Sequence, residues 1–109
     1  MDNVYFYDGK SSHYNEAVLD NYLNNKVKQY AKQDREAKRK WTTNYITKDW
    51  LKSQFGKRCS GCGDCLTFSI SGNKVYSNLS ADRKHNDEPH DINNIVPMCV
   101  DCNCAKSNR

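Results

Sequence analysis

The chain has few hydrophobic residues for its size. Of its 109 residues, 37% are hydrophobic, and the mean hydropathy is −0.99. A domain this small buries a limited core, so we expect an additional staple to hold it together. No stretch approaches the ~20 apolar residues that a membrane span needs, and residues 1–10 lack the apolar core of a signal peptide. We therefore expect an intracellular protein of a reducing compartment, neither secreted nor bound to a membrane.

Internal repeats and low-complexity tracts are also absent, but charge is unevenly distributed. Residues 1–58 hold 12 Lys and Arg against 7 Asp and Glu, whereas residues 59–109 hold 5 against 6. The excess is densest over residues 26–40. Such a run is typical of segments that follow a phosphate backbone, and the alternative is a solvated helix face with i,i+4 ion pairs. The candidate nucleic-acid contacts are Lys32, Arg35, Lys38, Arg39 and Lys40.

Two cysteine pairs, Cys59-x2-Cys62 and Cys99-x2-Cys102, are the strongest local pattern. Four thiolates in two pairs suit tetrahedral zinc. Six cysteines could instead form three disulfides in a secreted protein, but the missing signal core favours zinc. Cys65 and Cys104 lie outside the pattern, and we expect two spare buried thiols there. Because Cys65 also completes a CxxC with Cys62, an exchange of ligands stays open.

The hydrophobic pattern predicts a small α+β fold with a helical N-terminal extension over residues 1–45 and a zinc domain over 46–109. Residues 1–13 are expected to form a short strand or an ordered arm. Apolar residues at spacings of three and four predict one helix from about Tyr14 to Lys40. A second, short helix is expected to have Thr47 as its N-cap and to end at Gly56.

The zinc domain is expected to contain two strands, a polar loop and a short helix. Alternation predicts a strand over residues 66–70 and a returning strand over 75–79, which Ser80–Arg83 continue or leave. Residues 84–93 read as a polar loop. Residues 94–98 run back to the second cysteine pair, and residues 100–106 are predicted to be a helix that carries Cys102 and Asn103.

The segment ADRKHNDEPHDINNIVPMCVDCNCAKSNR resembles the core of the HNH (His-Me finger) nuclease family. The usual form there is Asp-His, a loop, Asn, an apolar run and Cys-x-x-Cys-Asn-x-x-Lys. The preceding ITKDWLKSQFGKRCSGCG resembles the helix and first zinc knuckle of many phage and large-virus members. The resemblance covers about residues 44–109. It implies a ββα-metal fold that binds one divalent ion, Mg2+ or Mn2+, and acts on double-stranded DNA.

The resemblance also implies roles for particular residues. Asp82 and Asn103 would hold the divalent ion, and both offer the oxygen ligands that a hard cation requires. Asn94 would hold the catalytic loop in place. The general base of the family is the histidine directly after the aspartate, and that position is Arg83 in this chain. An arginine stays protonated at physiological pH, so Arg83 can grip a phosphate but cannot act as a base.

Three interpretations of Arg83 follow. The chain is a zinc module that binds nucleic acid without cutting it, or His85 replaces the missing base, or His90 reaches in from the loop. His85 is the best candidate, because phage junction-resolving members of the family show Asp-His-x-His. We expect His90 to be solvated, as a lone histidine in a polar loop usually is.

The leading expectation is therefore an HNH-type zinc protein that acts on DNA as a metal-dependent endonuclease, or a derivative with an altered catalytic site. The alternatives are a catalytically inactive nucleic-acid-binding module and a structural zinc module that contacts an acidic protein. Larger relatives carry C-terminal domains beyond the Lys of the Cys-Asn-x-x-Lys motif. Self-association through the N-terminal helix is a further expectation.

Overall fold

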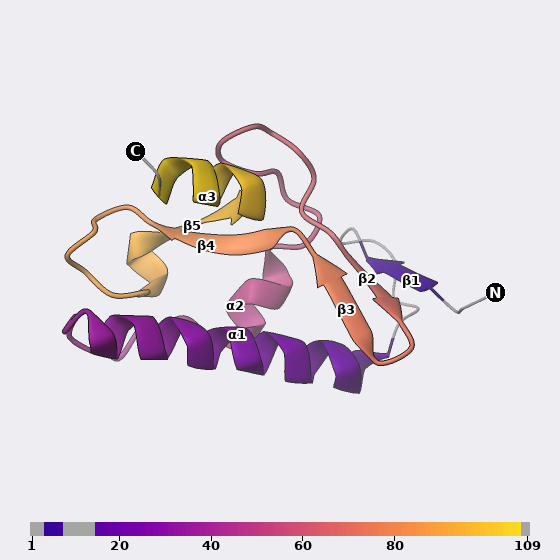
Figure 1. Ribbon diagram of the computed structural model, residues 1–109, viewed down its shortest axis with the longest axis horizontal. Coiled ribbons are helices and arrows are strands. Elements are labelled where there is room, and N and C mark those ends of the chain that lie inside the picture. Colours follow the sequence, from indigo (N-terminus) through magenta and orange to yellow (C-terminus); the bar gives the residue numbers. More distant parts are fainter. Residues whose placement is uncertain (1–3, 8–14, 108–109) are drawn as a thin grey trace.

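The computed structural model describes residues 4–7 and 15–107 of the chain. The elements follow in the order β1 (Val4–Tyr7), α1 (Glu16–Glu36), α2 (Lys48–Ser53), β2 (Phe68–Ser71), β3 (Lys74–Ser77), β4 (Leu79–Arg83), the 3-10 turn η1 (Ile92–Asn94), β5 (Ile95–Cys99) and α3 (Val100–Ser107). Strands β1, β2 and β3 form one antiparallel sheet in that order, and β4 and β5 form a second (Figure 1). The small α+β class is confirmed.

Helix α1 begins where the sequence supplies a capping side chain. The carboxamide of Asn15 accepts a hydrogen bond from the Val18 N–H at 3.3 Å, which satisfies one of the free amides of the first turn. The predicted apolar stripe is confirmed, because Leu19, Leu23 and Tyr30 are buried. The predicted start at Tyr14 lies outside the described residues.

The predicted end of this helix at Lys40 is wrong, because α1 stops at Glu36. Lys38 adopts φ +59°, a left-handed conformation that cannot continue a right-handed helix. The Lys38 N–H then donates to the carbonyl of Arg35 and the Arg39 N–H to that of Asp34, both of which are Schellman bonds. Residues 37–40, which include Lys38, Arg39 and Lys40, therefore leave the helix and do not form its last turn.

Helix α2 is also shorter than predicted. Its N-cap is confirmed, since Thr47 Oγ1 accepts from the Trp50 N–H at 3.1 Å. The helix ends at Ser53, and a turn, not the helix, leads on to Gly56 with φ +89°. The packing face is as expected, because Leu51 and Phe55 are buried.

The two sheets separate at Asn78, inside the strand predicted over residues 75–79, because β3 ends at Ser77 and β4 begins at Leu79. The Asn78 carboxamide accepts from the Thr67 N–H and donates to the Cys65 carbonyl, and its own carbonyl accepts from the Val100 N–H. The strand that follows, β4, pairs with β5 and places Asp82 opposite Val96. The predicted helix over residues 100–106 is confirmed as α3.

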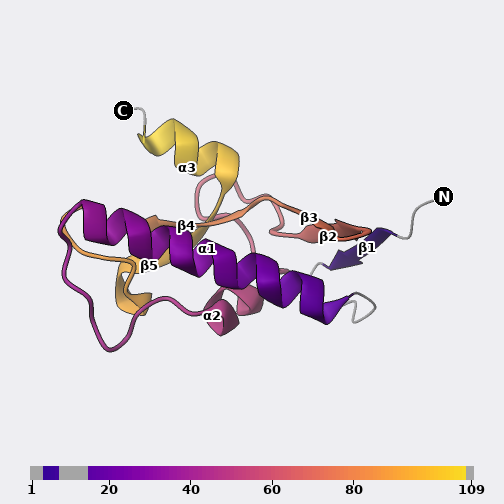
Figure 2. The same cartoon turned by 60° about the horizontal axis from the view of Figure 1, so that its bottom comes forward.

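Helix α1 runs along the molecule beside both sheets, from β3 at its start to the loop between β4 and β5 at its end (Figures 1 and 2). The core lies between these elements. Its largest fully buried side chains are Phe68, Leu19, Leu23, Leu51, Leu66, Ile70 and Leu79. The predicted short strand near the N-terminus forms as β1 and pairs with β2. Contacts thus cross residue 45, where the sequence suggests a domain boundary, and that division stays a prediction.

None of the helices that the structure describes is both long enough and apolar enough to cross a membrane.

Candidate metal centre and polar pocket

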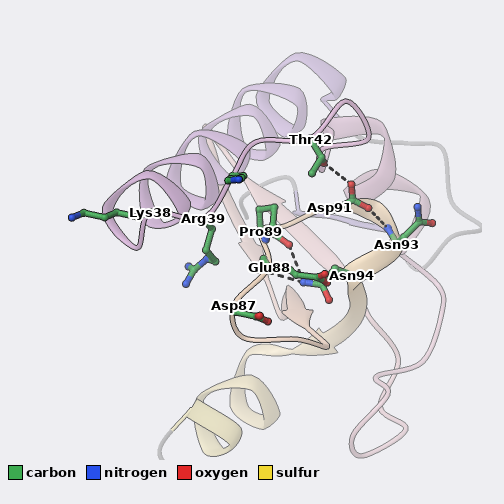
Figure 3. Close-up of a pocket in the computed structure, with 10 residues that line it drawn as sticks. Lys38, Arg39, Thr42, Asp87, Glu88, Pro89, Asp91, Asn93 and Asn94 are labelled. Carbon is green, nitrogen blue, oxygen red and sulfur yellow. Dashed lines mark hydrogen bonds between the residues drawn. The ribbon is translucent and has the colours of Figure 1, made fainter.

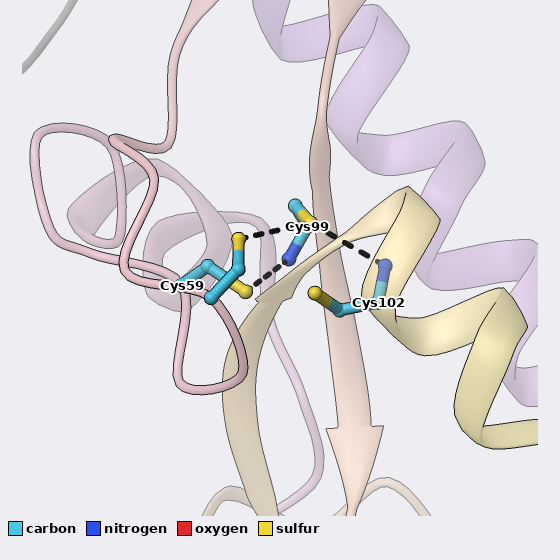
Figure 4. Close-up of side chains that lie close together, drawn as sticks. Cys59, Cys99 and Cys102 are labelled. Carbon is cyan, nitrogen blue, oxygen red and sulfur yellow. Dashed lines mark hydrogen bonds between the residues drawn. The ribbon is translucent and has the colours of Figure 1, made fainter.

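The two cysteine pairs come together at one end of the β4–β5 sheet. The four sulfur atoms of Cys59, Cys62, Cys99 and Cys102 lie within 4.8 Å of one another. The Cys62 and Cys99 sulfurs are 3.8 Å apart, which is about the edge of a tetrahedron with Zn–S bonds of ~2.3 Å. Figure 4 shows the loop that carries Cys59 facing the junction of β5 and α3, which carries Cys99 and Cys102. The donor set and spacing therefore fit a structural zinc ion.

Backbone amides support the thiolate form of Cys59. The Cys59 sulfur accepts from the Gly61 N–H at 3.2 Å and from the Cys99 N–H at 3.1 Å. Burial opposes ionisation of Cys59, but these N–H donors outweigh it and lower the pKa of the thiol to about 6. Hydrogen bonds with the sulfurs of Cys99 and Cys62 raise the pKa of Cys102. Four thiolates this close need a cation, which zinc would supply.

Gly61 and Gly63, which flank Cys62, are glycines for two different reasons. A methyl group on Gly61 would lie 3.1 Å from both the Cβ and the Sγ of Cys102, so the Cys102 side chain would have to shift to accommodate it. Gly63 has space around it but adopts φ +83°, a conformation that glycine takes without strain. Gly63 therefore relieves backbone strain, and Gly61 permits the close approach of Cys102.

The two remaining cysteines are not buried thiols. Cys104 is exposed and Cys65 is half-buried, and neither belongs to the four-sulfur group. Cys104 lies on α3 two residues beyond Cys102, so it points to a different side of the helix. The prediction that both thiols are buried is therefore wrong.

A polar pocket of about 390 Å³ lies between α1, β4, the β4–β5 loop and α3. Its lining contains Gln33, Asp82, Arg83, Asn86, His90, Asn103 and Lys106. The sequence-predicted pair Asp82 and Asn103 thus share one cavity. The Asn103 amide donates to Ser80 Oγ at 3.0 Å, which fixes its orientation on α3. The Lys106 ammonium lies 2.5 Å from Asp82 Oδ2.

His90 lies inside this pocket wall and not in solvent. Its residue is 3% exposed, so the expectation of a solvated histidine is wrong. The ring stacks against Tyr30 with centroids 4.4 Å apart, and its Nδ1 lies 2.9 Å from Asp34 Oδ2. The backbone N–H of His90 donates to the same oxygen at 3.1 Å. Helix α1, part of the N-terminal extension, therefore fixes the histidine through its Asp34.

Asp34 is the centre of a buried polar network. Its carboxylate also accepts from Arg39 Nε at 2.7 Å and from the Tyr45 hydroxyl. Burial opposes ionisation of this carboxylate, but the hydrogen bonds of its three partners outweigh burial and lower its pKa to about 2. An ionised carboxylate can only accept, so the His90 proton that faces it must sit on Nδ1.

The electrostatics of His90 follow from this arrangement. Burial lowers its pKa below the ordinary 6.5, while the Asp34 carboxylate partly opposes the shift. The ring is therefore neutral at pH 7. With the proton on Nδ1, the lone pair is on Nε2, the atom that can accept a proton.

Asn94 holds the β4–β5 loop from within. Its amide nitrogen donates to the carbonyls of His85 and Pro89, and its oxygen accepts from the His85 N–H at 3.0 Å. These bonds fix the loop's shape, as the resemblance implies. His85 itself is exposed and does not line the polar pocket. Its role as a base stays a prediction without geometric support.

Arg83 spans the mouth of the same loop. One terminal nitrogen of its guanidinium donates to the Asn86 carbonyl at 2.5 Å and lies 3.4 Å from that of Glu88. The side chain is half-buried and lines the pocket. Arg83 thus helps to shape the loop that carries His90.

The five predicted nucleic-acid contacts lie on the last turns of α1 and the turn that follows. Lys32 makes a 4.0 Å pair with Glu36 on the exposed face, the i,i+4 arrangement that was the alternative. Arg39 pairs with Asp34 and is mostly buried. The remaining three residues, Arg35, Lys38 and Lys40, are exposed.

A larger pocket of about 590 Å³ lies between this basic turn and the β4–β5 loop. Figure 3 shows Arg39 pointing toward the loop that carries Asp87 and Glu88, whereas Lys38 points outward. Thr42 Oγ1 donates to Asp91 at 2.5 Å and joins the two walls. Because its lining carries both basic and acidic side chains, this pocket does not indicate a particular class of ligand.

Comparisons with known proteins find no relative of this chain. No protein-family model matches the chain, and no curated protein or solved structure matches it significantly. The resemblance to HNH nucleases therefore stands on the quoted motifs alone.

Sequence reasoning missed Asp34 and undervalued His90. Asp34 lies in a basic run, where an acidic residue reads as one partner of a surface ion pair. One signal was present, since Asp34 falls four residues after the buried Tyr30 and so on the buried face of the helix.

Proposed function

We propose that this protein is a metal-dependent endonuclease of HNH type that acts on DNA, with His90 as its general base. The observation that carries this proposal is the shared pocket of His90, Asp82 and Asn103. In it, a neutral imidazole with an oriented Nε2 lines the same cavity as two side chains that offer oxygen ligands. Asp82 lies on β4, Asn103 on α3 and His90 in the loop between β4 and β5. These consecutive elements, which also carry two of the predicted zinc ligands, would form the ββα-metal unit.

The residues present fit a divalent cation. Asp82 is buried with an oxygen facing the Lys106 ammonium, so the pocket already favours positive charge beside this carboxylate. Carboxylate and amide oxygens suit Mg2+ or Mn2+, and Asp82 and Asn103 would hold the ion. When bound, such an ion would stabilise the negative charge that develops on the phosphate oxygens.

The chain's own groups would perform the proton transfer. His90 Nε2 would take a proton from a water molecule as the water oxygen bonds to phosphorus and the P–O bond to the leaving oxygen breaks. Asp34 would stabilise the imidazolium that forms, because its carboxylate accepts the Nδ1 proton. Arg83 would bind the scissile or a neighbouring phosphate, since a guanidinium pairs with phosphate bidentately.

Two observations favour the alternative of a zinc-stapled nucleic-acid-binding module without activity. The Lys106 ammonium already neutralises Asp82 at 2.5 Å, and an arginine stands where the family has its base. Under this alternative the pocket would bind a phosphate and not hydrolyse it.

Plasmid nicking by zinc-loaded protein tests the proposal, with added Mg2+, with added Mn2+, or with neither ion. We expect nicking that depends on the divalent ion, is lost in Asp82→Asn and His90→Ala, and is kept in His85→Ala. Imidazole added to His90→Ala should restore part of the rate, which a structural role would not allow. Zinc content and circular dichroism check that each variant is folded.

Other outcomes separate the alternatives. Nicking lost in His85→Ala but kept in His90→Ala would move the base to His85. An inactive wild type that binds DNA, with activity gained in Arg83→His, would establish the inactive binder.

A further inference from the structure

Trp41 is the most exposed large hydrophobic side chain among the described residues, with 70% of its surface accessible. It directly follows the basic turn Lys38-Arg39-Lys40. Neither the zinc centre nor the polar pocket uses it. A tryptophan is seldom left this open, so its surroundings can indicate what it contacts.

The surroundings of Trp41 combine an aromatic face with cations. Trp41, Tyr45, Arg35 and Arg39 line a hollow of about 180 Å³ together with Ala31 and Asp34. Lys38 and Lys40 are exposed beside it. An indole amid guanidinium and ammonium groups suits a ligand that offers flat aromatic surface and negative charge together, as a nucleotide strand does.

The hollow is connected to the polar pocket by hydrogen bonds. Arg39 Nε donates to one oxygen of Asp34, and the other oxygen of Asp34 lies 2.9 Å from His90 Nδ1. The Schellman bonds of Lys38 and Arg39 fix the start of the basic turn on α1. A strand held at Trp41 would therefore lie at a defined place beside His90.

We infer that Trp41 stacks on an unpaired base of the bound DNA while the neighbouring lysines and Arg35 contact its phosphates. The inference rests on the proposed function and narrows its substrate to DNA with a single-stranded segment at or next to the reacting phosphate. In a continuous duplex, neighbouring bases cover one another's faces, so only an unpaired base or a strand end offers a face to the indole. Stacking on an aromatic side chain contributes roughly 1–3 kcal/mol per base.

Charge argues against a second copy of this chain as the occupant. A two-fold symmetric contact through Trp41 would place the turn Lys38-Arg39-Lys40 of one copy beside the same turn of the other. Like charges in contact oppose such an interface. A nucleotide strand carries the opposite charge.

Fluorescence anisotropy with zinc-loaded protein, without added Mg2+ or Mn2+, tests the inference without requiring cleavage. The probes are a labelled oligothymidine, a fully paired duplex of the same length, and that duplex with a short single-stranded gap. We expect Trp41→Ala to weaken binding of oligothymidine and gapped duplex by roughly 5- to 150-fold, the equivalent of one lost stack. Binding of the paired duplex should change much less, and Trp41→Phe should keep part of the affinity.

Tyr76→Ala is the matched control, because Tyr76 is also exposed, at 56%, but lies on β3 away from the basic turn. It should leave binding of all three probes unchanged. The log–log dependence of affinity on salt should keep its slope in Trp41→Ala, since no phosphate contact is lost, and become shallower in Lys40→Ala.

Three results would overturn the inference, and a fourth would overturn only the proposed function. An equal loss for paired and unpaired probes, or no loss, would exclude stacking on an unpaired base. A dimer that Trp41→Ala converts to a monomer in sedimentation would make a second copy the occupant. Absence of binding to any probe at low salt would overturn this inference and the proposed function together, whereas stacking without any nicking would overturn only the endonuclease.

Discussion

At the scale of single residues, the polar pocket depends on Asp34 more than on any residue of the HNH-like motif. Asp34 is 3% exposed and joins its near neighbours Arg39 and Tyr45 to His90, which lies 56 residues away in the sequence. A buried carboxylate persists only with such partners, because burial without them would favour its neutral form. Removing one partner would therefore affect the whole network.

The pH dependence of nicking should report His90. Nε2 accepts a proton only from the neutral ring, so the rate should rise with pH through the pKa of His90 and level off. The midpoint should lie below 6.5, because burial lowers this pKa. Asp34→Asn should shift the midpoint further down, since the carboxylate that raises the pKa is lost, and should also lower the plateau. A pH–rate profile measures both.

Asp20→Asn is the control, because Asp20 is a carboxylate on the same helix that pairs with Lys48 and Lys52 and does not line the polar pocket. Its profile should match that of the wild type. A midpoint that stays fixed or rises in Asp34→Asn would contradict the proposed pairing.

The zinc knuckle offers a second test at this scale. In Gly61→Ala the new methyl group would lie 3.1 Å from the ligand side chain of Cys102, so the ligand must move. We expect zinc affinity to fall by roughly tenfold or more, comparable to the loss of an outer-shell partner. Competition with a chromophoric chelator measures this. Gly63→Ala, which is strained but unobstructed, should lose stability and keep its zinc affinity.

At the scale of elements, the end of α1 is the decisive feature. If the helix continued to Lys40, residues 37–40 would rise along its axis and away from the β4–β5 loop. The left-handed Lys38 turns the chain, and Arg39 then reaches Asp34. The same turn leaves Trp41 in the open beside the hollow that it lines.

Lys38→Gly should stabilise the protein by about 1 kcal/mol, because a non-glycine residue at φ +59° is strained. Lys38→Ala removes the same charge but keeps the strain, so it should give no such gain. Urea denaturation of the zinc-loaded proteins measures the difference. Equal stabilities of the glycine and alanine variants would show that Lys38 bears no strain.

At the scale of the whole molecule, the small hydrophobic core is supplemented by the four-cysteine cluster and by the packing of helix α1. The low hydrophobic content leaves a small core, and the four-cysteine cluster, which could bind zinc, joins the loop after α2 to the junction of β5 and α3. Metal binding to such a site contributes about 10 kcal/mol or more, comparable to the total stability of a small domain. Helix α1 then covers the second sheet through contacts such as the hydrogen bond from the Ala81 N–H to the Tyr30 hydroxyl.

Removal of zinc by a strong chelator should therefore abolish cooperative folding. We expect one zinc per chain in metal analysis and loss of the thermal unfolding transition in the apoprotein. Cys99→Ser should behave like the apoprotein, whereas Cys65→Ser and Cys104→Ser should keep both zinc and transition. A stable, cooperative apoprotein would show that the core alone suffices.

Local patterns in the sequence determined much of this protein. The spacing of the cysteine pairs predicted the four-cysteine cluster, Thr47 predicted the N-cap of α2, and the apolar stripe predicted the buried face of α1. Each of these features depends on neighbours within one element or on a rigid ligand geometry. Asn94 was likewise predicted to hold the loop, on the resemblance of its motif.

Only the tertiary structure decided the contents of the polar pocket. The resemblance favoured His85 because some members show Asp-His-x-His, but the loop folds so that His85 is exposed and His90 meets Asp34, 56 residues away. That pairing depends on where α1 packs and on the turn at Lys38, and neither leaves a periodic signal. Long-range polar contacts are set by the positions of whole elements, so the chemistry of this site emerges only when α1 lies against the second sheet.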